Sequence, residues 1–183
     1  MSSKILIKIP PSGELEEIHF GKHFSQALWV EFEPNECEKW FGCFPLENIN
    51  GYNTVLTNKE NEVALVVASG FGYLIDIEKK KMILKIAEYP PITSAILTEN
   101  PNYFVLGTYY SVYVIDNEKI VQKISPDFMV EGIYFKKQEN GNAIGDLASA
   151  ENHYESNIDF NFDLLSFKMT LDQKVKRKRF RLF

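Results

Sequence analysis

A repeated tetrapeptide constrains this chain most strongly. Tyr-Leu-Ile-Asp at positions 73–76 is followed forty residues later by Tyr-Val-Ile-Asp at positions 113–116. Each copy follows a short apolar segment and precedes a polar turn and a further apolar segment. A looser third copy occupies positions 144–171, and a shortened fourth unit lies upstream at 28–44. A repeat of this length indicates stacked modules, because one unit cannot bury its own apolar face.

The spacing of apolar residues within these units is that of β-strands. Apolar side chains occupy every second position from 158 to 164, and the alternation shifts by one residue after Asp163, where the chain reverses. Asn140-Gly141 is typical of a tight hairpin, because both residues tolerate the positive φ that such turns require. The chain has 14 Phe, 9 Tyr and 2 Trp, and aromatic side chains fit pleated sheets better than helices. The best helix signal in the body lies at 13–19.

A period of about 40 residues, with several short strands per unit and an Asp at the end of one strand, resembles the blades of β-propellers. The resemblance is to blade repeats in general, extends from about Leu28 to Leu171, and lacks the Gly-His and Trp-Asp signatures of the best-known class. It implies an all-β fold of about four propeller-like blade units of antiparallel strands. These units would either close into a ring or form an open stack or sandwich, with Lys4 to Ile9 completing the first unit as an edge strand.

Charge is divided unevenly between a long acidic body and a short basic tail. Residues 172–183 contain six basic residues and one acidic residue, a net charge of +5, so residues 1–171 carry a net charge of −10. We expect residues 1–171 to form a single all-β domain. Residues 172–183 would form a basic C-terminal tail or short helix, for which Thr170 to Gln173 offers a capping box. The body should repel nucleic acid and anionic membranes and attract cationic partners.

The sequence also predicts a cytoplasmic protein. The apolar residues near the N-terminus are interrupted by Lys and are not followed by a small-residue cleavage site. The longest apolar stretch, 63–75, contains Ser69 and two glycines and is too short to span a membrane. Two cysteines are too few for a secreted disulfide framework.

Residues capable of metal chemistry are present, but their spacing does not favour a site. His19, His23, Cys37 and Cys43 are the residue types that bind zinc. The two cysteines are six positions apart, which exceeds the usual separation of paired zinc ligands. We therefore expect two thiols and two imidazoles without a metal.

An aspartate ends the equivalent strand in three units, at Asp76, Asp116 and Asp163. The common position predicts that these carboxylates cap turns by accepting backbone N–H groups. The sequence contains no Gly-x-Ser-x-Gly motif and no phosphate-binding Gly-rich loop. We therefore expect no cofactor and no catalytic activity.

An acidic all-β platform with available aromatic side chains favours a binding protein over an enzyme. In acidity, size and blade-like repeats the chain resembles small bacterial toxin-immunity proteins, which implies a protein partner, a cationic toxin. The expected partner-binding residues combine negative charge with aromatic rings. They are Trp29, Glu31, Glu33, Glu36, Glu38 and Trp40. The sequence leaves the oligomeric state open.

Two alternative functions belong to other classes. A small β-fold hydrolase would need converging acids in the third repeat, for which Asp146, His153 and Asp159 are the candidates. A nucleic-acid-binding protein would depend on the basic residues from Lys174 to Arg181. The charge of −10 on the body opposes the second alternative.

Overall fold

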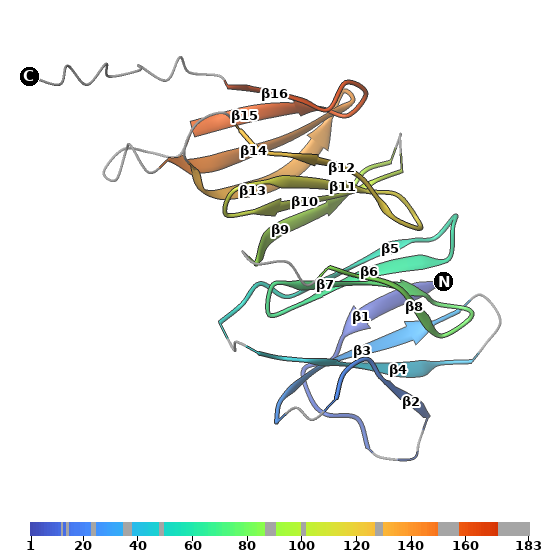
Figure 1. Ribbon diagram of the computed structural model, residues 1–183. Coiled ribbons are helices and arrows are strands. Elements are labelled where there is room, and N and C mark those ends of the chain that lie inside the picture. Colours follow the sequence, from blue (N-terminus) through green and yellow to red (C-terminus); the bar gives the residue numbers. More distant parts are fainter. Residues whose placement is uncertain are drawn as a thin grey trace, which may run out of the picture.

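The computed structural model describes residues 1–11, 13, 15–22, 25–34, 38–47, 50–86, 91–99, 102–126, 130–149 and 158–171. Within these residues the chain forms sixteen β-strands and no helix, arranged as four sheets of four strands. We call the sheets blades 1 to 4 in chain order. They are stacked one above another from blue to red in Figure 1. The expected all-β fold of about four blade units is confirmed, whereas the expected C-terminal helix falls on residues 172–183, outside the described ranges.

Each blade contains four short strands. Blade 1 contains β1 (Ser2–Ile5), β2 (Glu16–His19), β3 (Ala27–Glu33) and β4 (Trp40–Pro45). Blade 2 contains β5 (Thr54–Asn58), β6 (Val63–Ala68), β7 (Phe71–Asp76) and β8 (Lys81–Ile86). Blade 3 contains β9 (Ile92–Leu97), β10 (Phe104–Thr108), β11 (Val112–Ile115) and β12 (Ile120–Ile124). Blade 4 contains β13 (Val130–Glu139), β14 (Asn142–Ser149), β15 (Ile158–Asp163) and β16 (Lys168–Leu171). Nowhere in these described segments is there a helix that could cross a membrane.

Blades 2, 3 and 4 are simple antiparallel meanders. Their strands pair in chain order, so each blade is a series of hairpins. Asn140 and Gly141 form the turn between β13 and β14 with φ values of 50° and 76°, which confirms the hairpin predicted from this dipeptide. The three meanders correspond to the three repeats identified in the sequence.

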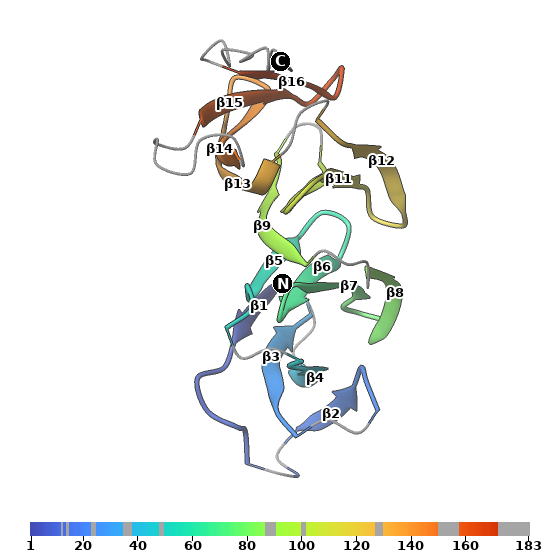
Figure 2. The ribbon, with the colours of Figure 1, turned by 60° about the vertical axis from the view of Figure 1, so that its left-hand side comes forward.

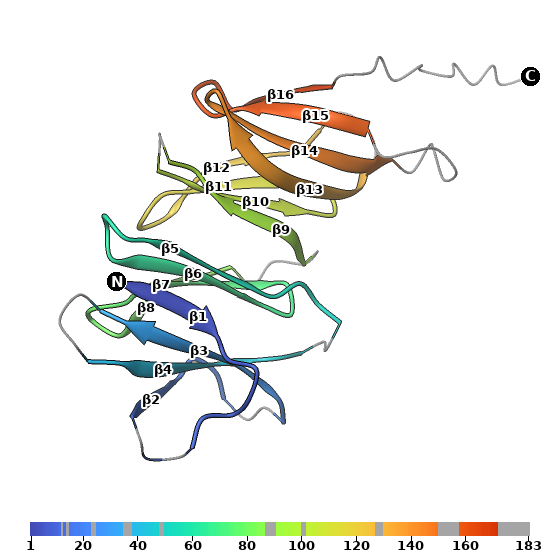
Figure 3. The same cartoon turned by 180° about the vertical axis from the view of Figure 1, so that it is seen from behind.

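Blade 1 has a different topology, with the strand order β1-β3-β4-β2. β1 pairs antiparallel with β3, whereas β2 pairs parallel with β4. The chain that follows β1 therefore runs from one edge of the blade to the other, on the side away from blade 2 (Figure 3). The helix expected at 13–19 is wrong, because Glu16–His19 pairs with β4 and this pairing outweighs a weak local helix preference.

Three apolar cores hold the stack together, each between two consecutive blades. The first core contains Phe32, Trp40 and Tyr73, the second contains Leu65, Leu74 and Phe104, and the third contains Val114, Phe135 and Phe160. A closed ring of four blades would need a fourth core between blades 4 and 1, and the described residues form none. These two blades lie at opposite ends of the molecule (Figure 2). The fold is therefore an open stack of blades.

The repeated aspartates cap turns, as the sequence predicts. In each case Oδ1 accepts the backbone N–H of the residue three positions later, at 2.8, 2.8 and 2.6 Å for Asp76, Asp116 and Asp163. Asp76 also forms an ion pair with Lys79, whose Nζ lies 2.8 Å from Oδ2. Burial opposes ionisation of Asp76, but the hydrogen bonds from Lys79 outweigh it and hold the pKa of this carboxyl below its usual 3.8.

This arrangement predicts an acid-sensitive contribution to stability at Asp76. A carboxyl whose pKa is lower in the folded state stabilises the fold above its unfolded pKa, and the contribution is lost as the pH falls through the folded value. We expect Asp76→Asn to lower the free energy of unfolding at pH 7 by less than about 1 kcal/mol, as for a surface ion pair. The variant should also lose less stability than the wild type between pH 5 and 2.

Urea denaturation across this pH range measures both effects. Asp159→Asn is the matched control, because Asp159 is exposed on a strand and caps no turn. An equal change of pH dependence in both variants would contradict the proposed role of the Asp76 turn.

Candidate binding surface on the first blade

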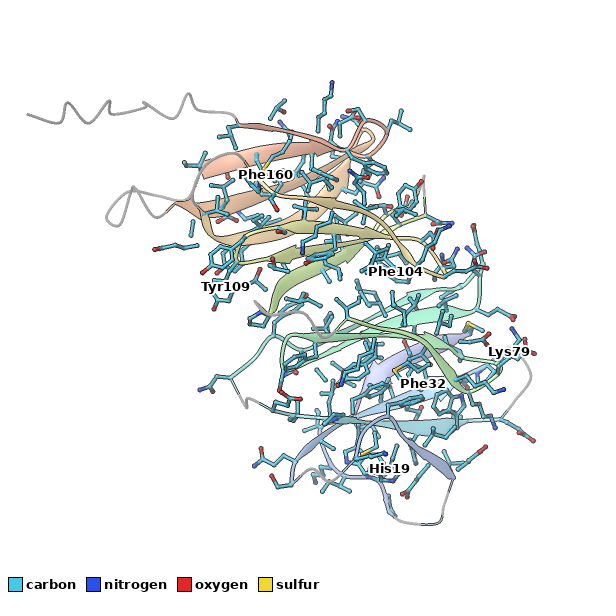
Figure 4. The ribbon with its side chains drawn as sticks, in the orientation of Figure 1. His19, Phe32, Lys79, Phe104, Tyr109 and Phe160 are labelled. Atoms are coloured by element: carbon cyan, nitrogen blue, oxygen red, sulfur yellow. The ribbon has the colours of Figure 1, made fainter. Side chains whose placement is uncertain are left out.

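The outer face of blade 1, which points away from blade 2, carries three of the predicted contact residues. Along β3 the residues Leu28, Val30 and Phe32 belong to the core shared with blade 2. Because successive side chains of a strand alternate between faces, Trp29, Glu31 and Glu33 lie on the outer face. In Figure 4 Phe32 lies on the side facing blade 2, and His19 lies on the opposite side.

Glu31 is at the centre of a row of ion pairs on this face. Its carboxylate lies 3.0 Å from Nζ of Lys4 on β1 and 3.1 Å from Nζ of Lys39, which precedes β4. Burial opposes ionisation of Glu31, but the hydrogen bonds from Lys4 and Lys39 keep its pKa below the usual value. The side chain is 15% exposed. Glu31 is therefore charged but already neutralised by two lysines.

Glu33 and Glu38 carry the more accessible negative charge. Glu33 accepts a hydrogen bond from the Ser2 hydroxyl at 3.0 Å and lies 3.8 Å from Lys39. The Glu38 side chain is 84% exposed, with Nζ of Lys80 from blade 2 at 3.8 Å. Such exposed pairs are weak, so both carboxylates can exchange these contacts for those of a partner. The predicted contact residue Glu36 lies outside the described residues.

Trp40 belongs to the interior and not to the outer face. It is 0% exposed, and its ring stacks on Phe32 with 4.3 Å between the ring centroids. Its indole Nε1–H donates a hydrogen bond of 3.1 Å to the carbonyl of Ile77 in blade 2. Trp40 cannot contact a partner in this fold, because its whole side chain is used to join blades 1 and 2.

A shallow apolar groove runs along the outer face, and the sequence did not reveal it. The groove has a volume of about 730 Å³. It is lined by the segment from Lys4 to Pro11 and by Glu31 and Phe41, which are paired across β3 and β4. Ile7 and Ile9 are 99% and 76% exposed at this groove, whereas Pro10 is buried. Ile7 and Ile9 are exposed because none of the described residues forms a further blade on this face.

Of the four zinc-type residues the structure describes two, His19 and Cys43, which are paired in register on β2 and β4. His19 lies edge-on to Trp29, with 5.9 Å between the ring centroids. Its neighbour Cys43 is buried, and burial raises the pKa of this thiol to about 11. The described residues contain no group of three His, Cys, Asp or Glu side chains that could hold a metal ion. His23 and Cys37 lie outside the described ranges.

The two acids considered for hydrolysis do lie together, at the other end of the stack. Asp146 on β14 and Asp159 on β15 are paired in register. Nζ of Lys136 lies 2.9 Å from the first carboxylate and 3.9 Å from the second. The single charge of Lys136 offsets one of the two negative charges and ties both carboxylates into an ion-pair network. His153 lies outside the described residues. The geometry therefore forms an ion cluster on the polar end face of blade 4.

Comparisons with known proteins add little to this description. No protein-family model matches the chain, and no curated protein matches its sequence. Among solved structures, the chain is similar to the β-propeller domain of Cps50 (Swd1) from Myceliophteria thermophila, with 14% sequence identity and a TM-score of 0.45. The match covers 69% of this chain and 40% of that chain, so this chain spans less than half of that structure.

Proposed function

We propose that this chain is a non-catalytic protein-binding module whose partner docks on the outer face of blade 1. The observation that carries the proposal is the exposure of Ile7 and Ile9 beside an apolar groove. Covering one such side chain is worth about 1.5–3 kcal/mol. Exposed apolar residues surrounded by charged ones are typical of surfaces that contact other proteins.

The proposed partner is a cationic protein. The net charge of −10 on residues 1–171 accelerates encounters with a positively charged molecule. Glu33 and Glu38 place accessible carboxylates on the blade that carries the groove. An acidic module that covers the active surface of a basic toxin fits these properties. The proposed role is therefore that of a cytoplasmic bacterial immunity protein, with the toxin encoded by a neighbouring gene.

Co-purification with the product of the adjacent gene tests this function, and a one-to-one complex at low salt is expected. Ile7→Ser combined with Ile9→Ser should weaken binding about 100-fold, since the lower estimate for two side chains is about 3 kcal/mol. Glu33→Lys combined with Glu38→Lys should slow association about tenfold and reduce its salt dependence, as loss of electrostatic steering does. Titration calorimetry and stopped-flow fluorescence measure the two effects.

Matched controls lie elsewhere on the stack. Leu165 is 82% exposed in the turn between β15 and β16, so Leu165→Ser removes a similar apolar side chain far from blade 1. Glu118→Lys reverses an exposed charge in blade 3. The proposal fails when no complex forms at low salt, or when the controls weaken binding as much as the blade 1 variants.

A further inference from the structure

We propose that the basic tail, residues 172–183, folds back across the outer face of blade 4 and places its arginines on a group of exposed tyrosines. The outer face of blade 4 is the face that points away from blade 3. The tyrosines are Tyr109 and Tyr110 of blade 3 and Tyr134 of blade 4. The inference concerns the opposite end of the stack from the groove of blade 1, so it does not depend on the proposed function.

Two of the tyrosines form the tip of the hairpin between β10 and β11. Tyr109 and Tyr110 are 39% and 55% exposed, with 6.3 Å between their ring centroids. The buried Thr108 holds the turn below them, because its Oγ1 accepts the backbone N–H of Tyr110 at 3.3 Å and that of Ser111 at 3.0 Å. The equivalent turn of blade 2, between β6 and β7, contains Ser-Gly at positions 69–70 instead. Such a turn forms without aromatic side chains, so the two rings are available for a contact.

Tyr134 extends this aromatic surface onto blade 4. It is paired in register with Asp146 and alternates with the core residue Phe135, so its side chain lies on the outer face. Its ring lies over Gly132, where a Cβ atom would be 2.6 Å from the ring. Burial raises the pKa of Tyr134, and the proximity of Tyr109 and Asp146 raises it further. The three tyrosines therefore lie close together across the two blades.

A row of charged side chains runs from Tyr134 to the other edge of blade 4. Tyr134 on β13 is paired with Asp146 on β14, which is paired with Asp159 on β15. The single charge of Lys136 leaves one negative charge on this row, and the Asp159 side chain is 67% exposed. Two further pairs of opposite charge on this face are Lys137 with Glu139 and Lys168 with Asp163. A basic side chain beside Asp159 is therefore favoured.

The tail begins at this edge of the row. β16 is described as far as Leu171, which is paired with Phe160 on β15. If the same register continued, Asp172 would lie opposite Asp159, and like charges in this position repel. We therefore expect the chain to leave the edge of the sheet after Leu171 and to turn onto the outer face.

The length and chemistry of the tail match the surface. β13 lies three strands from β16, a distance of about 14 Å. Arg177 is six residues beyond Leu171, a reach of about 20 Å in extended chain. Arg177, Arg179 and Arg181 are the only arginines of the whole chain, and the lysine at position 174 precedes them. A guanidinium group stacks on aromatic rings and pairs with carboxylates, so the arginines suit the tyrosines and the lysine suits the row.

Two other arrangements are less favoured. A basic segment of another protein offers the same chemistry, but it competes with a tail whose attachment gives an effective concentration in the millimolar range. Nucleic acid would also bind the tail, but its phosphates would then approach a body with a net charge of −10.

Trypsin cleavage of the full chain within residues 174–181, followed by mass spectrometry, measures how much the surface protects the tail. At low salt we expect Tyr109→Ser with Tyr110→Ser to be cut about tenfold faster than the wild type, the combined size of one exposed cation–π contact and one surface ion pair. Tyr109→Phe with Tyr110→Phe keeps the rings and should be cut at the wild-type rate. Leu165→Ser is the matched control, because it removes a side chain that is 82% exposed at the other end of blade 4.

The arginine side chains provide an independent measurement. Because the chain has no arginine outside the tail, the three Nε–Hε cross-peaks of a ¹⁵N NMR spectrum report on the tail alone. Stacking on tyrosine rings should move them upfield of free arginine at low salt, and about 0.5 M NaCl should return them part of the way by screening the charges. Tyr109→Ser with Tyr110→Ser should return them at low salt. Asp159→Asn should return them in part, whereas Glu118→Gln on blade 3 should leave them in place.

Several outcomes would overturn the inference. Equal cleavage rates in the serine variant and the wild type, or Nε–Hε signals at the positions of free arginine at low salt, would show that the tail is not on this face. Protection that grows with protein concentration would assign the tail to a second copy. Protection that appears only after addition of a DNA duplex would assign it to nucleic acid, and protection that appears only with the product of the adjacent gene would assign it to the partner.

Discussion

Replacing Trp40 with alanine is expected to lower the free energy of unfolding by about 3–5 kcal/mol, the range for a large aromatic residue in a core. Trp40 has no exposed surface, stacks on Phe32 and donates a hydrogen bond to the Ile77 carbonyl. The substitution removes the ring from the core between blades 1 and 2 and leaves a buried carbonyl without its donor. Guanidinium denaturation followed by far-ultraviolet circular dichroism measures the loss without depending on tryptophan fluorescence.

Two further variants separate the packing of Trp40 from its hydrogen bond. Trp40→Phe keeps an aromatic ring but removes the donor to Ile77, so a smaller loss of about 1–3 kcal/mol is expected. Trp29→Ala removes the other tryptophan, which is half-buried on the outer face. This substitution should lower the free energy of unfolding less than Trp40→Ala does. Equal stability of Trp40→Ala and the wild type would show that this side chain does not hold the two blades together.

We expect Gly107→Ala to lower the free energy of unfolding about as much as Trp40→Ala does, because the backbones of blades 3 and 4 are in contact at this residue. A Cβ atom at Gly107 on β10 would lie 2.0 Å from the carbonyl oxygen of Ile133 on β13. No rotamer change relieves a clash with backbone, so the two blades must separate. We expect the free energy of unfolding to fall by about 3 kcal/mol or more, at the upper end of the range for overpacked cores. Urea denaturation measures it, and limited proteolysis should show blade 4 cut first.

The control for Gly107 is the same substitution where space is open. Nothing lies within 4 Å of a Cβ added at Gly13, whose φ is +84°. Gly13→Ala should therefore lower the free energy of unfolding only by the strain of a left-handed backbone, about 1–2 kcal/mol. Ser94→Ala probes the same interface more mildly. The Ser94 hydroxyl donates to the Ile133 carbonyl and accepts from Phe135 N–H, each at 2.9 Å. Equal effects of Gly107→Ala and Gly13→Ala would contradict the close approach of blades 3 and 4.

The features that could be predicted from the sequence are local and repeated. The three meander blades follow from the repeated tetrapeptides, and the Asn140-Gly141 hairpin follows from the φ values that only certain residues adopt. The capping role of Asp76 and its equivalents follows from their common position at the end of a strand. Each of these depends on residues within one hairpin, so a single sequence contains the information.

The features that could not be predicted depend on contacts between distant segments. Every residue of β4 is buried, because blade 2 covers one face of blade 1 and the segment after β1 partly covers the other. A strand buried on both faces has no polar alternation, so the sequence could not show that Trp40 points inward. The parallel pairing of β2 with β4 is likewise non-local. The groove beside Ile7 and Ile9 depends in turn on where the segment after β1 lies against Glu31 and Phe41, and no local sequence pattern indicates this.

The open stack also implies that stability differs along its length. Blades 2 and 3 each share a core with two neighbours, whereas blade 1 shares a core with blade 2 alone. Repeat proteins coupled only through nearest neighbours open first at their ends, so amide protons of blade 1 should exchange with solvent faster than those of blades 2 and 3. A protein that covers the free side of blade 1 supplies the missing neighbour, and its binding would slow exchange in the terminal sheet.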